Sequence, residues 1–361
     1  MIWLFKDDWE AACQRLEAWW EGELIDRCVV LVTAPRDEAA RRKKPKPHGD
    51  IREWWLDVEY RINEAEAEFR STFYGGEAFP IFFPNLGPGI AAAYMGVQPV
   101  FAEETVWFDQ APIIDNWEDR QPITLDENNQ WWQVTKELTQ GSLARSENRW
   151  ITAITDLGGG LDLVASLRGI KSLLMDLIDH PDAVKQLSEE IQHVWFRCFD
   201  ELNRMIHQSM VATSSWMPIW CKGTWYPLQC DCSAMISPGM FEEFVLPGLQ
   251  EQCRQLDYSI YHWDGPGQIP HLDLLLSIPE LTGIQWTPGD GNPRVDSPKW
   301  YPLYKRIQDA GKNLVLLDTP PRGIERLLKE LSPKGLLIQT HVDSEAEARS
   351  LLEDVARWSA R

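Results

Sequence analysis

The last third of the chain repeats one pattern four times: a short apolar run, a polar loop and a helical stretch. The expected strands cover residues 259–261, 282–286, 313–317 and 336–339, and the helices that follow cover residues 270–278, 300–310, 323–331 and 344–358. Successive strands that alternate with helices run parallel, because each helix carries the chain back to the edge where the strand began. The repeat therefore predicts an α/β fold with a parallel sheet.

Apolar runs earlier in the chain supply further strands. They cover residues 28–32, 80–85, 151–156, 215–220 and 228–232. With three or four of these the strand count approaches eight, and 361 residues suit one large barrel with insertions. We therefore predict an α/β (β/α)8 TIM barrel in a single domain, residues 1–361. An N-terminal helical extension is expected at residues 1–27, and a basic, proline-rich loop at residues 36–50.

The net charge of the chain limits the classes of partner that we expect. The net charge is −20 and the pI is near 4.8, so the surface repels phosphate backbones and nucleic acid is not an expected partner. The run Arg41–Lys44 is the one strongly cationic island; we expect a solvated loop, with a docking patch for an anionic ligand or protein as the alternative.

The sequence indicates a cytoplasmic protein. No run of about 18 apolar residues could span a membrane, and the N-terminus lacks the pattern of a secretory signal. The seven cysteines are odd in number and scattered, which is typical of free thiols in a reducing compartment. Only Cys230-Asp231-Cys232 is clustered, and we expect two small apolar side chains flanking a strand end, with a metal site as the alternative.

Polar side chains gather where the expected strands end. In an α/β barrel the catalytic groups come from the carboxyl ends of different strands. His262 and Asp264 stand two positions apart, so both side chains leave a strand on one face, and Gly265 lets the backbone turn away. The full set of polar side chains expected at strand ends is Asn85, Asp156, Asp231, His262, Asp264, Gln285, Asp318 and His341.

Three chemistries fit this set. His262, Asp264 and His341 are residue types that bind Zn²⁺ and leave one position open for a substrate or an activated water. Alternatively, two carboxylates could share the acid and nucleophile or base roles at a glycosidic bond. The candidates for that pair are Asp156, Asp231, Asp264 and Asp318. Finally, Asp231 could hydrogen-bond a substrate without any metal.

Tryptophans near strand ends are candidates for substrate contact. Most of the nineteen tryptophans are expected in the core, but Trp220, Trp263 and Trp286 could line a pocket and stack on a planar ligand or a sugar. Nucleotide binding and serine hydrolysis are not expected, because the motifs GxGxxG, GxxxxGK[ST] and G-x-S-x-G are absent.

Three stretches resemble the uroporphyrinogen decarboxylase-like superfamily, which includes zinc-dependent methyltransferases that serve corrinoid proteins or coenzyme M. The stretches are residues 156–181, Asp231 with the Ser-Pro helix start at residues 236–247, and His262-Trp263-Asp264-Gly265, which is similar to the His-x-Cys-Gly zinc segment of the methyltransferases. The likeness covers the chain from about Ile151 onward. Asp264 stands where those enzymes have a zinc-binding cysteine, and His341 is the nearest candidate for the later zinc cysteine.

The resemblance implies a metal-dependent methyltransferase acting on a small methylated substrate. His262, Asp264 and His341 would hold Zn²⁺, and Asp231, Gln285 and Asp156 would complete the catalytic set. The substrate would contact Asn85, Trp220, Trp263, Trp286 and Asp318. A separate corrinoid protein or folate would be the methyl partner, because no cobalamin-binding segment is visible. A porphyrinogen is not the expected substrate, because the arginine-rich N-terminal segment of the decarboxylase is missing.

Two alternatives stay open. One is a metal-free carboxylate acid/base enzyme acting on a small polar substrate such as a glycoside. The other is a barrel that binds a small molecule or a partner protein without catalysis, since one fold hosts many functions.

Overall fold

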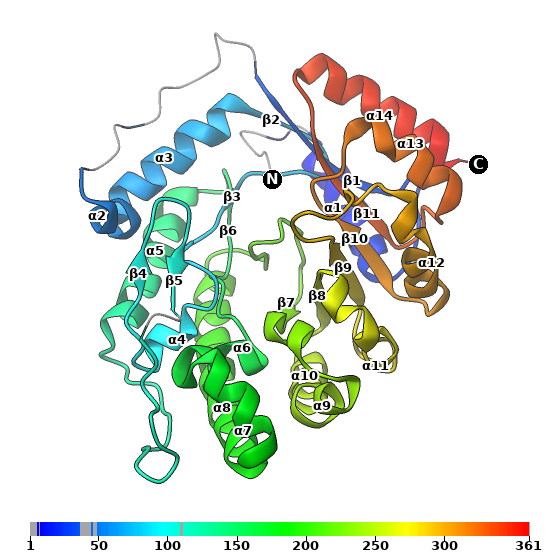
Figure 1. The fold of residues 1–361 in the computed structure, drawn as a ribbon. Helices are drawn as coiled ribbons and strands as arrows, with labels where there is room; N and C mark the ends of the chain where they lie inside the picture. Colours follow the sequence, from blue (N-terminus) through cyan, green and yellow to red (C-terminus); the bar gives the residue numbers. More distant parts are fainter. Residues whose placement is uncertain (1–5, 7, 37–44, 46–48, 109–110, 361) are drawn as a thin grey trace.

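A computed structural model describes residues 6, 8–36, 45, 49–108 and 111–360 of the chain. The fold is mixed α/β, with a mostly parallel central sheet and helices packed around it (Figure 1). The central sheet has seven strands in the order β2-β1-β11-β10-β9-β8-β7. Its strands are β1 (Val29–Pro35), β2 (Thr72–Gly76), β7 (Trp225–Gln229), β8 (Tyr258–Asp264), β9 (Gly283–Thr287), β10 (Asn313–Leu316) and β11 (Leu336–His341).

Helices separate most of these strands. In the first half they are α1 (Trp9–Trp20), α2 (Ile51–Leu56), α3 (Val58–Ser71), α4 (Ala91–Tyr94), α5 (Gln130–Ser146), α6 (Gly160–Arg168) and α7 (Ile170–Asp179). In the second half they are α8 (Pro181–His207), α9 (Pro238–Phe244), α10 (Leu246–Gln255), α11 (Leu272–Leu276), α12 (Tyr301–Asp309), α13 (Pro321–Glu330) and α14 (Glu345–Ser359).

The predicted parallel pairing in the last third is confirmed. β7 pairs with β8, β8 with β9, β9 with β10, and β10 with β11, all parallel, and β11 then pairs parallel with β1. Only β2 runs antiparallel, along the free edge of β1. The pairing puts the carboxyl ends of β7, β8 and β9 side by side, with Gln229 opposite His262 and His262 opposite Gln285.

The strand predicted at residues 215–220 is wrong. The described chain forms only an isolated antiparallel bridge between Thr213 and Cys221 at this place. Ser215 and Ser214 turn their hydroxyls onto the carbonyls of Met217 and Ile219, so side chains take over backbone bonding within the segment. Local Ser–carbonyl bonds of this kind compete with a sheet ladder.

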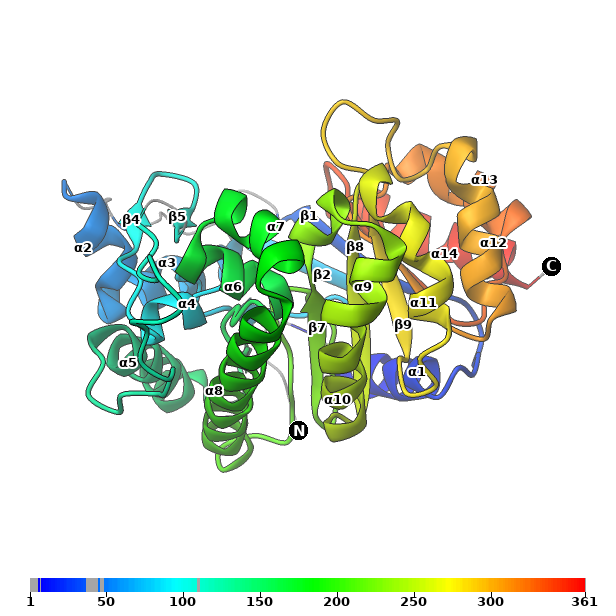
Figure 2. The ribbon, with the colours of Figure 1, turned by 60° about the horizontal axis from the view of Figure 1, so that its bottom comes forward.

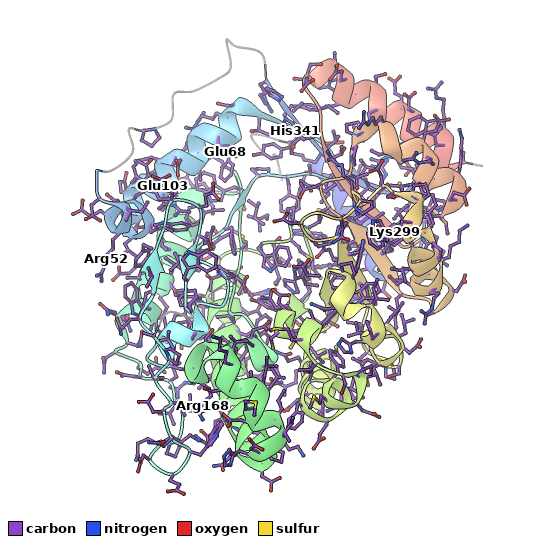
Figure 3. All side chains as sticks on the ribbon, viewed as in Figure 1. Arg52, Glu68, Glu103, Arg168, Lys299 and His341 are labelled. Atoms are coloured by element: carbon purple, nitrogen blue, oxygen red, sulfur yellow. The ribbon has the colours of Figure 1, made fainter. Side chains whose placement is uncertain are left out.

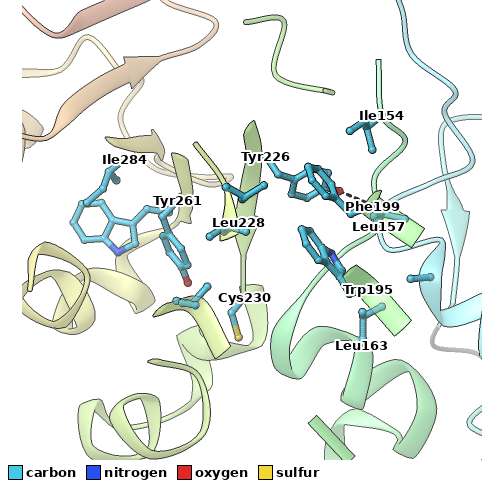
Figure 4. Packing of buried hydrophobic residues seen from close by; sticks show 14 of the residues in the cluster. Ile154, Leu157, Leu163, Trp195, Phe199, Tyr226, Leu228, Cys230, Tyr261 and Ile284 are labelled. Carbon is cyan, nitrogen blue, oxygen red and sulfur yellow. Dashed lines mark hydrogen bonds between the residues drawn. The ribbon is translucent and has the colours of Figure 1, made fainter. Parts of the chain in front are cut away.

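A second, smaller parallel sheet pairs β3 (Ile81–Phe82) with β6 (Ile151–Thr152). No ladder joins β6 to β7 in the described chain; instead the hydroxyl of Tyr226 accepts from the Leu157 amide at 2.7 Å and donates to the Thr155 carbonyl at 3.2 Å. Figure 4 shows Tyr226 in this position, packed beside Trp195 and Phe199 of α8. We call this place the β6–β7 seam. A short antiparallel pair, β4 (Val100–Phe101) and β5 (Val106–Trp107), lies apart from both sheets.

Residues along each strand alternate between two faces of the central sheet, as expected for extended backbone. One face packs on α1, and we call it the α1 face; its apolar residues include Leu31, Ile260, Val315 and Leu337. Their sequence neighbours join the larger cluster with helices α8 to α14. Because His262 and Asp264 follow Ile260 at steps of two, their side chains share the α1 face.

The helical extension predicted at residues 1–27 is present as α1. It covers the amino ends of the strands (Figure 2): the Trp20 indole donates to the Trp220 carbonyl at 2.9 Å and stacks on Tyr258 at the start of β8. The Asn313 amide at the start of β10 donates to the Trp19 carbonyl at 2.8 Å. The carboxyl ends of the strands, at the other edge, are left for a functional site.

Other sequence expectations had mixed outcomes. The long helix expected at residues 182–208 is α8, whereas the helix expected from residue 237 to about 256 is broken into α9 and α10. Pro247 in the first turn of α10 explains the break, because proline lacks the amide that would continue the helical bonding.

Most of the basic loop at residues 36–50, including Arg41–Lys44, lies outside the described residues. Among the described residues, no helix has the length and apolar character needed to cross a membrane.

Candidate functional site

Asp231, His262 and Asp264 converge at the carboxyl ends of β7 and β8. One ligand-type atom from each lies within 4.8 Å of the other two, and His262 Nε2 is 4.0 Å from Asp231 Oδ1. His262 and Asp264 meet because they are two residues apart on β8, and Asp231 joins them because β7 is the neighbouring strand. The sequence predicted all three residues as part of the site. We call them the Asp231–His262–Asp264 cluster.

Gln285 sets the orientation of the His262 ring. Its Nε2 donates to Thr287 Oγ1 at 2.7 Å, so its Oε1 is the acceptor that faces His262 Nδ1. Nδ1 therefore carries the proton in the neutral ring, and Nε2 keeps its lone pair on the side of Asp231. Metal-binding histidines are usually held by such a bond from the other ring nitrogen. The sequence predicted Gln285 as a catalytic residue; the structure places it next to His262.

One carboxylate oxygen in the cluster has no partner. Asp264 Oδ1 is buried, and no hydrogen-bond donor reaches it within the described residues. A buried carboxylate oxygen without a donor costs free energy unless a cation or a ligand donor meets it. The unpaired oxygen, the free His262 Nε2 and the Asp231 carboxylate thus offer an incomplete coordination shell.

The carboxylates around His262 differ in environment. The Asp231 side chain is 51% exposed, yet partial desolvation raises its pKa; His262 opposes the shift, and the charges of Asp264 and Asp156 add to it. Asp156 follows β6 and is almost fully buried, and burial raises its pKa to about 6 despite the Gly158 amide at 2.8 Å and the influence of His262. Asp156, also predicted from the sequence, is thus a third carboxyl group, close enough to interact with the two in the cluster.

Sequence reasoning missed Trp216. Its indole ring lies edge to face against the His262 ring, with centroids 5.1 Å apart and planes at 88°. Its Nε1 is buried without an acceptor in the described structure. Trp216 belongs to the irregular segment between Thr213 and Cys221, where no periodic pattern indicates which way a side chain points. The one sequence feature that could have pointed to Trp216 is its position directly after two serines in a short apolar stretch.

Sequence reasoning also missed Asp162, in the first turn of α6. Its carboxylate accepts the amide of Asp231 at 2.7 Å and that of Cys232 at 2.8 Å, and so holds the 3-10 turn Asp231–Met235 that follows β7. An acidic residue in the first turn of a helix was the available signal, but it reads as ordinary helix stabilisation. Asp162 fixes the direction in which the Asp231 side chain leaves the backbone.

The tryptophans expected to contact substrate do not join the cluster. Trp263 and Trp286 are 0% and 1% exposed and pack against each other on the face opposite His262 and Gln285. Side chains alternate along a strand, so the neighbour of an α1-face residue must point the other way. Trp220 precedes β7 and lies near the amino ends of the strands, where its ring packs edge to face with Trp9 and its carbonyl accepts the Trp20 indole. These three placements argue against ligand contact at the cluster.

His341, expected as the third metal ligand, is not part of the Asp231–His262–Asp264 cluster. β9 and β10 lie between β8 and β11, so His341 does not come from a strand next to the cluster. His341 Nδ1 instead lies 3.0 Å from Thr33 Oγ1. Asp231, and not His341, is the third residue that the structure brings together with His262 and Asp264.

His341 lines a separate pocket of about 270 Å³ beside β1, β2 and β3. Glu68 near the end of α3 lines the same pocket, and Figure 3 labels both side chains. The remaining walls are mainly apolar and aromatic, including Phe69, Tyr74 and Phe79. Gln339, which also lines this pocket, accepts the amide of Asp318 at 3.0 Å.

Asp318 and Asn85, both expected to bind substrate, follow β10 and β3. Asp318 is exposed and has a positive φ of 49°, a conformation that asparagine and aspartate tolerate better than most residues. Asn85 is half-buried and its side chain accepts the Gly87 amide at 2.9 Å, which shapes the loop after β3. Neither side chain belongs to the Asp231–His262–Asp264 cluster.

A scan against protein-family models and a search of curated proteins found no match to this chain. The likeness to the uroporphyrinogen decarboxylase-like superfamily therefore depends on the motifs that suggested it.

Proposed function

We propose that the chain is a metal-dependent enzyme of the uroporphyrinogen decarboxylase-like type, with a divalent ion held by Asp231, His262 and Asp264. The observation that carries the proposal is the convergence of the three residues, one ligand-type atom of each lying within 4.8 Å of the other two, together with a buried Asp264 Oδ1 that no donor meets. The Gln285 contact to His262 Nδ1 supports it, because it leaves Nε2 free on the side of the carboxylates.

Zinc is the ion that we propose. Imidazole nitrogen and carboxylate oxygen are both zinc ligands, and three protein ligands leave a fourth position for a substrate atom or water. When bound, the ion would supply a Lewis acid that polarises a substrate heteroatom or activates an acceptor. His341 is not needed for this ligand set, which differs here from the set expected from the sequence.

The other residues of the site orient the proposed metal ligands or are available to contact the substrate. Gln285 holds the His262 tautomer, and Asp162 holds the backbone of Asp231. Trp216 covers the edge of the His262 ring and offers an unused indole N–H to a ligand atom. Asp156 has a pKa near 6 and is available as a proton acceptor or donor near neutral pH.

Methyl transfer is the reaction class that we propose. Its support is the resemblance of His262-Trp263-Asp264-Gly265 and of the Ser237-Pro238 helix start to the zinc-dependent methyltransferases. The substrate would be a small methylated molecule. A separate corrinoid protein or folate would be the methyl partner, because the sequence shows no cobalamin-binding segment of its own.

We also infer a single (β/α)8 barrel as the finer description of the fold. In the described part of the chain, six parallel strands of the central sheet and the two of the β3–β6 pair make up the eight that a barrel needs. The Tyr226 bonds at the β6–β7 seam support closure between the two sheets. A reducing, cytoplasmic location is part of the proposal, supported by seven free cysteines.

Metal analysis of purified protein tests the proposal. We expect His262→Ala and Asp264→Ala each to hold about one equivalent of zinc less than the unaltered protein after identical loading and desalting. His193→Ala is the matched control, because His193 is exposed on α8, far along the chain from the cluster, and should hold as much zinc as the unaltered protein. Equal zinc content in His262→Ala and the unaltered protein would overturn the proposal.

A carboxylate glycosidase is the second candidate, and one observation favours it. Oxygens of Asp231 and Asp264 lie within 4.8 Å, close to the roughly 5 Å separation of retaining glycosidases. Hydrolysis of aryl glycosides that persists in chelator and is lost in Asp231→Asn would favour this reading over the metal enzyme.

A further inference from the structure

A second group of side chains that could bind a metal lies next to Asp231. Asp162, Cys230 and Cys232 each offer an atom within 4.8 Å of the other two, and the two sulfurs are 3.8 Å apart. Cys230 and Cys232 are buried at 0% and 7% exposure and belong to no disulfide. The sequence predicted two apolar side chains here, and their burial agrees with that reading, but it does not explain the carboxylate beside them.

The spacing of the sulfurs matches a tetrahedral zinc site. Zinc–sulfur bonds are about 2.3 Å long, so two thiolates at the tetrahedral angle stand about 3.8 Å apart. The observed separation of Cys230 Sγ and Cys232 Sγ is 3.8 Å. Two thiolates on one ion would therefore need little rearrangement of the strand end.

Asp162 is placed to be the third ligand. Each of its oxygens already accepts one amide, from Asp231 and from Cys232, at 2.7 and 2.8 Å. A carboxylate oxygen has a second lone pair, so both bonds can persist when a metal binds.

A pocket approaches this group from the outside of the sheet. It has a volume of about 250 Å³ and lies between α8 and the α9–α10 pair, and its lining residues include Gly160, Gln192, Phe244 and Gly248. Gly160 forms the wall next to the thiols: a Cβ at this position would stand 3.7 Å from Cys230 Sγ. Gly160 is thus the lining residue of the pocket that lies beside Cys230.

We propose that Asp162, Cys230 and Cys232 bind Zn²⁺ in a second, thiolate-containing site. Both thiols release their protons to solvent as the ion binds, and a water or a group entering from the pocket completes the tetrahedron. Asp231 lies between the two cysteines in the chain, so the ion fixes the backbone that presents Asp231 to His262. This site does not depend on the proposed enzymatic function, because it uses none of the ligands of the Asp231–His262–Asp264 cluster.

Cobalt substitution distinguishes the two sites. Co²⁺ bound by thiolates gives an intense sulfur-to-metal charge-transfer absorption, which oxygen and nitrogen ligands do not give. We expect this absorption when Co²⁺ is added to the metal-free protein, and we expect it to persist in His262→Ala. It should disappear in the double variant Cys230→Ser/Cys232→Ser and remain in Cys253→Ser, a matched control at a buried cysteine of α10.

Zinc X-ray absorption on the unaltered protein keeps the proposal testable if the double variant does not fold. We expect sulfur scatterers at about 2.3 Å from zinc in the loaded protein. Only nitrogen and oxygen scatterers, or a cobalt absorption that survives in the double variant, would overturn the second site. The first site fails separately, if His262→Ala keeps its full zinc content while the sulfur signal is present.

Discussion

At residue 262, one ring nitrogen faces the Gln285 amide oxygen and the other faces a pair of carboxylates. Strand alternation alone predicted that His262 and Asp264 share a face, because the period of two is a local property of the backbone. It could not show that Asp231 rather than His341 completes the group. That depends on strand order, since β7 adjoins β8 whereas β11 is separated from it by two strands.

Asp156 gives a prediction for the pH dependence of stability. Its pKa is about 6 in the folded chain against an ordinary value of 3.8, because burial disfavours the charged form. Below about pH 3 the carboxyl is protonated in both states and costs nothing. As the pH rises to about 6 the unfolded chain ionises first, so the contribution of Asp156 to folding stability falls, by roughly 2–3 kcal/mol in total.

In Asp156→Asn this loss is absent. We therefore expect the free energy of unfolding of the variant to gain on that of the unaltered protein between about pH 4 and about pH 6, with no further relative gain above. Urea unfolding in chelator at several pH values measures it, and chelator keeps metal binding out of the comparison. The groups that act on Asp156 include the amides of Gly158 and Gly89, the Tyr226 hydroxyl, His262, Asp162 and Asp231. A difference that is constant over this range contradicts the assignment.

At the scale of elements, β8 carries side chains of the candidate site on one face and side chains of the hydrophobic core on the other. His262 and Asp264 lie on the α1 face, whereas Trp263 packs between Trp286 and the helices on the opposite face. The sequence indicated a mixed role for these tryptophans, because a ring at a strand end is equally compatible with a pocket wall. Packing decides it: the Trp263 indole donates to the Gln268 carbonyl at 2.9 Å and is sealed from solvent.

This arrangement predicts a sharp contrast between replacing a buried tryptophan on β8 and replacing an exposed tryptophan elsewhere. Trp263→Ala should lower the free energy of unfolding by about 3–5 kcal/mol, because it opens a large cavity in a packed core. Trp107→Ala, on the 49% exposed side chain of β5, should change it by less than about 0.5 kcal/mol. Urea denaturation of the two variants checks this. A mild effect at Trp263, with loss of ligand or metal binding instead, would return that residue to the functional site.

The irregular segment between Thr213 and Cys221 could not be predicted from the hydrophobic periods of helices and strands. Its apolar and serine residues suggested a strand, but serine hydroxyls bond within the segment and direct Trp216 onto His262. The four strand–helix units of the last third were predictable because each combines two strong local periods with short loops. Where a chain segment is shaped by its own side chains, neither period applies.

At the scale of the whole molecule, the β6–β7 seam joins the two sheets through a side chain. Tyr226→Phe removes both hydroxyl bonds of the seam and leaves the buried Leu157 amide without an acceptor. We expect a loss of about 1–3 kcal/mol in the free energy of unfolding, the usual cost of an unpaired buried group.

Tyr258→Phe is the control for the seam. It loses a hydroxyl bond to Glu21 at the exposed amino end of β8 and should cost less than about 1 kcal/mol. Amide hydrogen exchange adds a second readout: exchange at Leu157 should accelerate in Tyr226→Phe and not in Tyr258→Phe. Equal stability of the two variants would mean that the seam is held by other contacts.

The tripeptide Cys230-Asp231-Cys232 is held from one side by Asp162 and offers its central carboxylate to the other. The effects of substitutions there are coupled, because loss of the Asp162 carboxylate leaves the amides of residues 231 and 232 without their acceptor and releases the backbone that orients Asp231. Homologues should therefore vary at residue 162 and within 230–232 together, as one unit of evolutionary change, whichever small molecule each descendant has come to use.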